Sequence, residues 1–332
     1  MTTANSTDFP PIPADIAATT APLLFGTLFN WALYGVLSIQ TYIYYLHFPD
    51  DKIGNKILVY TCYIIEVVQT AMTSADLYFW FATGYGNVTH LGNVNISPVD
   101  TPVLCGIIAA IVQCFFAYRI FTLRRSYLWI CVLIIVTSVV QTVGALATAF
   151  RSFKLQEYAR FHENVIFPQA LDVWYIGDTI CDILIAGTML WLLHTSQKQE
   201  GINHARQIFA KLVRLVVETN TLTASMALIS FICYITLPKG NVFICTTLVM
   251  GKLYSNTLLM TFNNRIALRN MQKQHATIDG TGRIRQHTDV NITVDTFRAF
   301  DTFPDPQLES ESYEIDARKD KVHELTAVVT AV

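Results

Sequence analysis

Seven long apolar stretches are the feature that most constrains how this chain folds. A bilayer core of ~30 Å is crossed by about 20 helical residues, and each stretch approaches or exceeds that length. A backbone surrounded by lipid has to satisfy its own hydrogen bonds, which favours helices. The sequence therefore predicts an all-α membrane protein, a seven-transmembrane helix bundle. The predicted spans are approximately residues 21–46, 57–81, 103–120, 128–150, 173–193, 215–237 and 242–262.

Composition and charge support this interpretation and exclude other classes of protein. Charged residues make up only 14% of the chain, against about 25% in soluble domains. The formal net charge of −2 does not favour nucleic-acid binding, which requires a concentrated basic face. We expect the lipid bilayer to be the main partner of the chain, and no nucleic acid to be one.

The distribution of Lys and Arg near the span ends predicts the orientation. Twelve of these residues lie on the side that holds the first inter-span segment and the carboxyl end, and four lie on the other side. Cytoplasmic loops are enriched in Lys and Arg, so we expect an external amino terminus and a cytoplasmic carboxyl terminus, with the protein in the plasma membrane. Asn5 and Asn87 head sequons on the predicted outer side and are candidate glycosylation sites.

This orientation divides the chain into an extracellular segment (residues 1–20), the bundle (21–262) and a cytoplasmic tail (263–332). The tail begins with Arg265, Arg269 and Lys273, four residues apart, which either lie along the anionic inner leaflet or form a solvated helix end. Beyond His287 the composition is acidic and polar, with few large apolar residues. Such a composition predicts that the tail is mostly disordered.

Polar and ionisable residues inside the predicted spans are the candidate functional residues. Each charge at mid-membrane costs roughly 2.5–3.5 kcal/mol on insertion scales, so each calls for a partner. Glu66, Asp182 and Lys252 are predicted near the midplane, and Asp178 lies four residues before Asp182 on the same helix face. The predicted intramembrane network comprises Glu66, Gln69, Asp76, Asp178, Asp182, Lys252 and Asn256. The same residues would also serve to fix helix register or to supply interhelical hydrogen bonds without any further activity.

Several stretches of the chain resemble a known family. They include DILIA at 182–186, LVVET at 215–219, KLYSN at 252–256, and, in the first half, GTLFNW at 26–31 and VQTA at 68–71. In these stretches the chain resembles seven-span membrane proteins of mushroom-forming fungi, the family called domain of unknown function 6534. The resemblance is concentrated in residues 173–262. It implies a fungal membrane protein of that fold, and it implies no activity, because none is established for the family.

The residues are compatible with two functions, and they support two others only weakly. The predicted topology and the long polar tail favour a receptor-like or sensory protein, with a small-molecule ligand and a cytoplasmic signalling partner. The alternative is a transporter or proton-coupled carrier that uses Glu66, Asp182 and Lys252. Lys252 lies in the last span, where opsins carry their Schiff-base lysine, but a photoreceptor is disfavoured because span 3 lacks a carboxylate. We expect neither an enzyme nor a cofactor or metal site, because HExxH, GxSxG and CxxC patterns do not occur.

Overall fold

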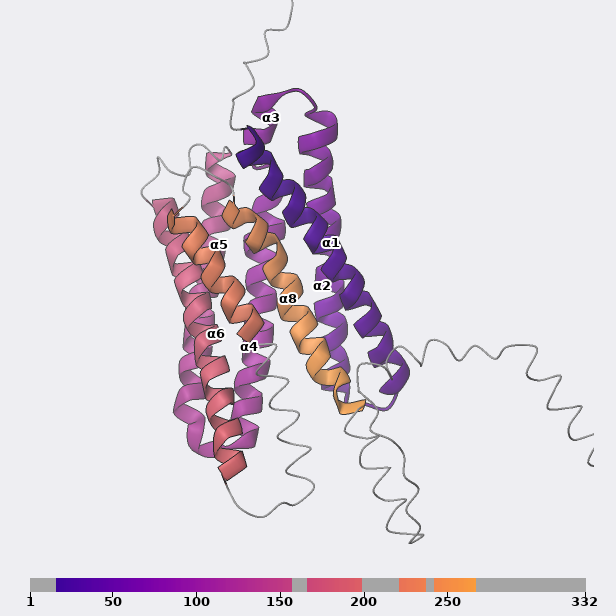
Figure 1. The fold of residues 1–332 in the computed structure, drawn as a ribbon, viewed down its shortest axis with the longest axis vertical. Helices are drawn as coiled ribbons and strands as arrows, with labels where there is room; N and C mark the ends of the chain where they lie inside the picture. The colour runs from indigo at the N-terminus through magenta and orange to yellow at the C-terminus, as the bar shows by residue number, and fades with distance from the viewer. Residues whose placement is uncertain (1–15, 157–165, 199–220, 237–241, 267–332) are drawn as a thin grey trace, which may run out of the picture. The chain divides into compact units, whose positions relative to one another are not determined.

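The computed structural model describes residues 16–156, 166–198, 221–236 and 242–266, and their regular structure is helical (Figure 1). Two helices are extended by π-helical turns. The elements are α1 (Ile16–His47), α2 (Ile53–Tyr78) with its π-helical extension η1 (Phe79–Thr83), α3 (Val88–Gly92), the π-helical turn η2 (Val99–Val103), α4 (Leu104–Leu123), the 3₁₀ turn η3 (Arg125–Tyr127), α5 (Leu128–Leu155), α6 (Ile166–Lys198), a helix at Thr221–Thr236, and α8 (Val242–Asn263).

Six of these helical segments are long and apolar enough to cross a membrane: Ile16–His47, Ile53–Thr83, Val99–Leu123, Arg125–Leu155, Pro168–Leu192 and Val242–Asn263. They correspond to six of the seven predicted spans. The remaining prediction, at 215–237, falls partly outside the described residues, and its described part, Thr221–Thr236, is a shorter apolar helix. Six spans are therefore present in the described part of the chain, and the seventh stays a prediction.

The first five spans begin three to five residues earlier than the hydropathy pattern predicts, and two of these earlier starts bear on the site. Helix α1 begins at Ile16, five residues before the predicted start, so part of the predicted extracellular segment is helical. The third span begins at Val99, because the turn η2 continues directly into α4. This turn contains Asp100 and Pro102, which lower its mean hydropathy, and for this reason the hydropathy pattern did not include it in the span.

Helix α5 shows that the polarity of the bundle is inverted relative to a soluble protein. Its outward side chains Val132, Val136, Val139 and Val143, three or four residues apart, are 51–60% exposed. Its inward face instead buries polar side chains such as Gln141. An apolar exterior around a partly polar interior is what a lipid environment selects. Together with the six span-length helices, it indicates an integral membrane protein.

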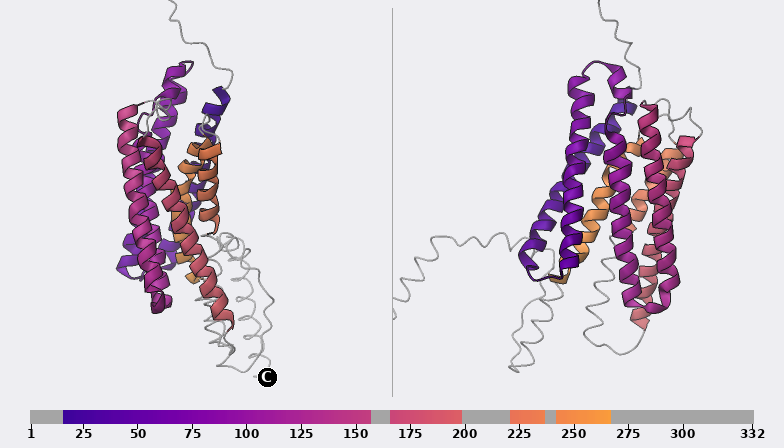
Figure 2. Two further views of the ribbon diagram at one scale, coloured as in Figure 1. Left: turned by 90° about the vertical axis from the view of Figure 1, so that its left-hand side faces the viewer. Right: turned by 180° about the vertical axis from the view of Figure 1, so that it is seen from behind.

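Helix α8 contacts α1, α2 and α4, and Figures 1 and 2 show it beside α1. Of its most apolar 18-residue stretch, 78% is buried, against 33–56% in the other five spans. Helix α1 packs along α8, α5 packs along α6, and α4 contacts both groups. The Thr221–Thr236 helix joins them through Tyr234, whose ring lies 5.8 Å from that of Tyr175 on α6 and 5.7 Å from that of Phe243 on α8.

Small residues allow α5 and α6 to approach closely. A Cβ atom added at Gly144 on α5 would lie 2.9 Å from the backbone nitrogen of Trp174 and 3.2 Å from the carbonyl oxygen of Ala170 on α6. Lipid supplies no hydrophobic drive for helix association, so such backbone proximity is a main source of packing energy in membranes. The glycine at this position is therefore required by the α5–α6 contact.

We predict that Gly144→Ala lowers the free energy of unfolding of the purified protein by about 1–3 kcal/mol, because the added methyl group meets backbone atoms that cannot move aside. The loss is measured as a lower thermal stability. The matched control is Gly187→Ala on α6, where an added Cβ would meet nothing within 4 Å. This control should be neutral or slightly stabilising, because alanine is the better helix former. Equal thermal stability of the two variants would contradict the close approach of α5 and α6.

Candidate functional site: buried polar clusters and a pocket at one end of the bundle

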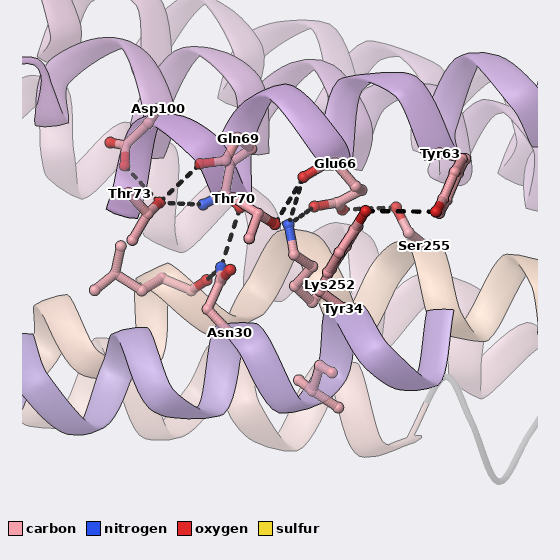
Figure 3. A network of polar contacts seen from close by, with 12 residues as sticks. Asn30, Tyr34, Tyr63, Glu66, Gln69, Thr70, Thr73, Asp100, Lys252 and Ser255 are labelled. Atoms are coloured by element: carbon pink, nitrogen blue, oxygen red, sulfur yellow. Dashed lines mark hydrogen bonds and ion pairs between the residues drawn. The ribbon is translucent and has the colours of Figure 1, made fainter. Parts of the chain in front are cut away.

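An ion pair between α8 and α2 lies at the centre of the first polar cluster (Figure 3). The Lys252 ammonium and the Glu66 carboxylate are paired, and both side chains are 0% exposed. Lys252 Nζ also donates to the carbonyl oxygen of Glu66 at 3.1 Å and to Oε1 of Gln69 at 2.5 Å. The three ammonium hydrogens thus meet three acceptors, which is the condition for burying a cation without a large cost.

The cluster continues from Gln69 toward the end of α2. Gln69 Nε2 donates to Thr73 Oγ1 at 3.1 Å, and the Thr73 hydroxyl donates to Oδ2 of Asp100 at 2.7 Å. Asp100 lies in η2, is 1% exposed, and also accepts from the Thr101 hydroxyl at 2.8 Å. A chain of hydrogen bonds therefore joins the Lys252 ammonium on α8 to a second buried carboxylate in η2.

Two further side chains join α1 and α8 to this cluster. Asn30 Nδ2, on α1, donates to Gln69 Oε1 at 3.1 Å and to the carbonyl oxygen of Leu248 at 2.6 Å. Ser255 Oγ, on α8, donates to Oε1 of Glu66 at 2.7 Å. The cluster thus connects α1, α2, η2 and α8, and its links cross helix interfaces except for Gln69–Thr73 within α2 and Asp100–Thr101 within η2.

A second cluster holds the acids of α6 (residues 178 and 182) against α4, α5 and α8. The Tyr254 hydroxyl lies 2.9 Å from Oδ1 of Asp178 and 2.8 Å from Oδ2 of Asp182. Gln113 Nε2 donates to Asp178 at 3.2 Å and to Asp182 at 3.4 Å, and its own Oε1 accepts from Gln141 at 2.6 Å. A phenol has one hydrogen, so the Tyr254 hydroxyl shares that hydrogen between the two carboxyl groups.

The structure therefore separates residues that the sequence grouped together. Glu66 and Lys252 form a pair and Gln69 joins them, whereas Asp178 and Asp182 belong to the second cluster. Asp76 belongs to neither: its Oδ1 accepts from Asn95 Nδ2 at 2.6 Å and from the backbone nitrogen of Ile96 at 3.2 Å. Both of these partners lie in the segment between α3 and η2.

The other predicted residues are placed as follows. Asn256 Nδ2 donates to the carbonyl oxygen of Lys252 at 2.7 Å and to that of Leu33 at 3.2 Å, and so ties α8 to α1. Asn87 lies between the turn at Gly84 and α3, and its carbonyl oxygen accepts from the backbone nitrogen of His90. Asn5 and the tail from residue 267 onward lie outside the described residues.

A pocket of about 430 Å³, open space at its mouth included, lies at one end of the bundle. Its walls come from the segment 94–102, the last turns of α5 and the first turns of α6 and α8. Trp174 and Phe243 supply aromatic surface, and Thr148 and Tyr175 supply hydroxyl groups. Thr101, the donor to Asp100, also lines the pocket. One wall residue is thus bonded directly to the first polar cluster.

The other end of α8 is held by a second ion pair. Arg265, two residues after the end of α8, pairs with Asp51 in the turn between α1 and α2. Burial favours a raised pKa of the Asp51 carboxyl. Hydrogen bonds from Arg265, Tyr44, the Lys52 backbone and Asn55 outweigh it and hold the pKa well below its usual range. Asp51 is therefore ionised at neutral pH and available to anchor Arg265.

Sequence reasoning missed several members of these groups. Asp100 lay outside the predicted third span, and Asp51 was one acid in a short loop. Tyr254 and Gln113 carry no charge, so the hydropathy pattern did not single them out. One signal was present: α8 carries Lys252, Tyr254, Ser255 and Asn256 within little more than one turn, which predicts polar partners on more than one side of the helix.

Comparison with known proteins adds a family match for part of the chain. Residues 178–267 match the model of a family of unknown function, DUF6534. The match covers less than a third of the chain, and it includes Asp178, Asp182, Lys252 and Tyr254. It supports the resemblance in the second half of the chain and assigns no activity. No curated protein and no solved structure shows significant similarity to the chain.

We predict that Glu66→Gln and Lys252→Met each destabilise the protein by about 3–5 kcal/mol, because each leaves one buried charge without its partner. The double variant should lose less than the sum of the two single losses, since it leaves neither charge unpaired. The measurement is a double-mutant cycle of thermal stability in detergent. Strictly additive losses would show that the two side chains do not meet.

Proposed function

We propose that the chain is a receptor-like membrane protein in which α8 carries the effect of a ligand from the pocket to the opposite end of the bundle. In this proposal a seventh span includes the Thr221–Thr236 helix. The amino terminus and the pocket face the outside of the plasma membrane, and the carboxyl terminus is cytoplasmic. The basic residues near the cytoplasmic ends and the tail would receive a signalling partner.

One observation carries this proposal: α8 reaches both ends of the bundle while it is buried between them. Phe243, Ile244 and Thr247 in its first turns line the pocket, and Arg265 follows its last turn and binds Asp51. Its 22 residues correspond to ~33 Å of rigid helix at 1.5 Å per residue. A ligand that changes the packing of the first turns therefore acts on the element that also holds the Asp51–Arg265 pair.

The contacts of α8 suit a switch between discrete arrangements. Lys252, Tyr254 and Asn256 are bonded to α2, α6 and α1 respectively. A helix held by several directional bonds does not slide continuously, because a small displacement breaks bonds before new ones form. Coupling between the two ends then requires a ligand that binds one arrangement more tightly than the other.

A carrier is the second candidate, and the Asp178–Asp182–Tyr254 cluster favours it. Two buried carboxyl groups that share a tyrosine hydroxyl have the composition of a proton-binding site. A carrier would show proton or solute flux in proteoliposomes that Asp182→Asn or Lys252→Met abolishes. A receptor should show no flux above that of protein-free vesicles, and such a mutation-sensitive flux would replace the receptor proposal.

We predict that Asp51→Asn increases hydrogen exchange at the pocket end, in residues 94–102 and 242–247. The substitution weakens the anchor of Arg265, and α8 should transmit this loosening to its first turns. The expected rate increase is at least ~5-fold, the lower limit of typical coupling between sites. Hydrogen–deuterium exchange with mass spectrometry on the full chain in lipid nanodiscs measures it without any ligand.

The matched control is Asp50→Asn, which removes a neighbouring carboxylate that is exposed. It should leave exchange at the pocket end unchanged. Exchange that increases around residues 48–55 in Asp51→Asn but stays unchanged in both pocket segments would contradict transmission through α8.

A further inference from the structure

Arg119 on α4 is a charged side chain without a partner in the described part of the chain. It lies inside the third span, one turn before α4 ends at Leu123, and it is half-buried. No described residue accepts a hydrogen bond from its guanidinium or forms an ion pair with it. An arginine keeps its charge in a protein, and a charge within a span is costly without a counter-charge. This position therefore favours an anion from outside the described part of the chain.

A second arginine, Arg265, lies close to Arg119 although it follows a different helix. The ring of Phe115, one turn before Arg119 on α4, lies 5.2 Å from the ring of Phe262 on α8. The guanidinium of Arg265 in turn lies 5.0 Å from the centre of the Phe262 ring. The two positive charges are close enough to repel each other. The packing of α4 against α8 thus brings two guanidinium groups together beside Phe262.

Asp51 compensates the charge of Arg265 and leaves that of Arg119. It pairs with Arg265 and accepts from both of its terminal nitrogens, with 3.2 Å between Nη1 and Oδ1. Arg265 Nε donates to the carbonyl oxygen of Phe262 at 3.1 Å. These bonds use three of the five guanidinium hydrogens, so Arg265 keeps N–H groups for a further acceptor. The two arginines therefore share an uncompensated positive charge and unused donors.

Exposed aromatic side chains at this end of the bundle indicate the depth of Arg119. Tyr45 near the end of α1, Tyr118 on α4 and Trp129 at the start of α5 are 63–67% exposed. Tyrosine and tryptophan gather where the hydrocarbon core meets the lipid headgroups. An arginine at this depth extends its guanidinium toward the headgroups. The anion that a membrane itself offers at this depth is the phosphate of a phospholipid.

We infer that Arg119 and Arg265 together bind the headgroup phosphate of an anionic phospholipid. A guanidinium matches the geometry of a phosphate through two parallel hydrogen bonds. The uncompensated charge favours an anionic lipid over a zwitterionic one. Free phosphate has the same chemistry, but it lacks the chains that hold a headgroup at this depth. The inference goes beyond the proposed function and does not need it, because a receptor and a carrier are both surrounded by lipid.

The test compares two lipids that share dioleoyl chains and differ in headgroup charge, phosphatidylglycerol and phosphatidylcholine. Each is titrated into the full chain in detergent, and native mass spectrometry measures the binding of the first lipid molecule. We expect phosphatidylglycerol to bind ~5-fold more tightly, which is the preference that one basic residue gives at an anionic surface. Inorganic phosphate in excess over the lipid should not displace the phosphatidylglycerol.

Two variants test whether the preference comes from Arg119. Arg119→Gln should lower the preference for phosphatidylglycerol to ~2-fold or less, because it removes the uncompensated charge. The matched control is Arg124→Gln, which removes the same charge just after the end of α4. Arg124 is exposed, and its guanidinium lies 5.5 Å from the centre of the Tyr127 ring. The control should keep the preference of the unaltered chain.

A second measurement uses the unaltered chain and therefore does not depend on the folding of a variant. Both lipids, each with a diazirine at the headgroup end of one chain, are photo-crosslinked to the full chain in nanodiscs. The phosphatidylglycerol probe should label residues 115–122 at least ~3-fold more than the phosphatidylcholine probe does. Residues 129–136 of α5, at the same end of the bundle, should be labelled equally by the two probes.

Several results would overturn the inference. Equal binding of the two lipids, or equal labelling of residues 115–122 by the two probes, would show that no anionic lipid is selected. Displacement by inorganic phosphate would show that the ligand is not a lipid. A preference that survives in Arg119→Gln, or that falls as far in Arg124→Gln, would show that surface charge in general attracts the lipid and that Arg119 forms no site.

Discussion

The buried pair of Lys252 and Glu66 is the interaction on which the rest of the arrangement depends. A lysine at 0% exposure in a lipid-embedded bundle is tolerated only with a full set of acceptors. Those acceptors come from α2, so α8 has to lie against α2 with this face turned inward. Once α8 is placed there, its other sides meet α1 and α4, and it becomes the most completely buried of the six spans.

The polar residues of α8 then divide the interior into two clusters with different chemistry. On one side Lys252 neutralises the Glu66 carboxylate through an ion pair, and Ser255 donates a hydrogen bond to it. On another side Tyr254 faces two carboxyl groups of α6 with no cation among its described contacts. The Lys252–Glu66 pair in the first cluster balances its own charges and stabilises helix positions. The second cluster holds two carboxyl groups around one hydroxyl hydrogen, which is why a carrier is the competing proposal. Both clusters are held by one helix that also lines the pocket.

Much of this architecture could be predicted from the sequence, and the remainder depends on helix rotation. Apolar runs of ~20 residues have few outcomes in lipid, so six spans followed directly from hydropathy. The similar depth of Lys252 and Glu66, which their ion pair requires, also followed from counting along the spans, which gave Asp182 the same predicted depth. The choice of Glu66 rather than Asp182 as the partner of Lys252 did not follow from the sequence, because depth carries no information about which helices are neighbours. Asp100 was concealed for a different reason: a π-helical turn with a proline extends its span beyond the apolar run.

The most direct test of the placement of α8 is a cross-link at the depth of the ion pair. A Cβ atom added at Gly251 would lie 3.5 Å from Glu66 Oε1 and 3.9 Å from Sγ of Cys105 on α4. With a lipid-soluble oxidant, Gly251→Cys should therefore form a disulfide with Cys105, identified by mass spectrometry of peptides, whereas the lipid-facing Gly187→Cys should not. Absence of the bond in Gly251→Cys, with the protein folded and the introduced thiol intact, would contradict the burial of α8 against α2 and α4.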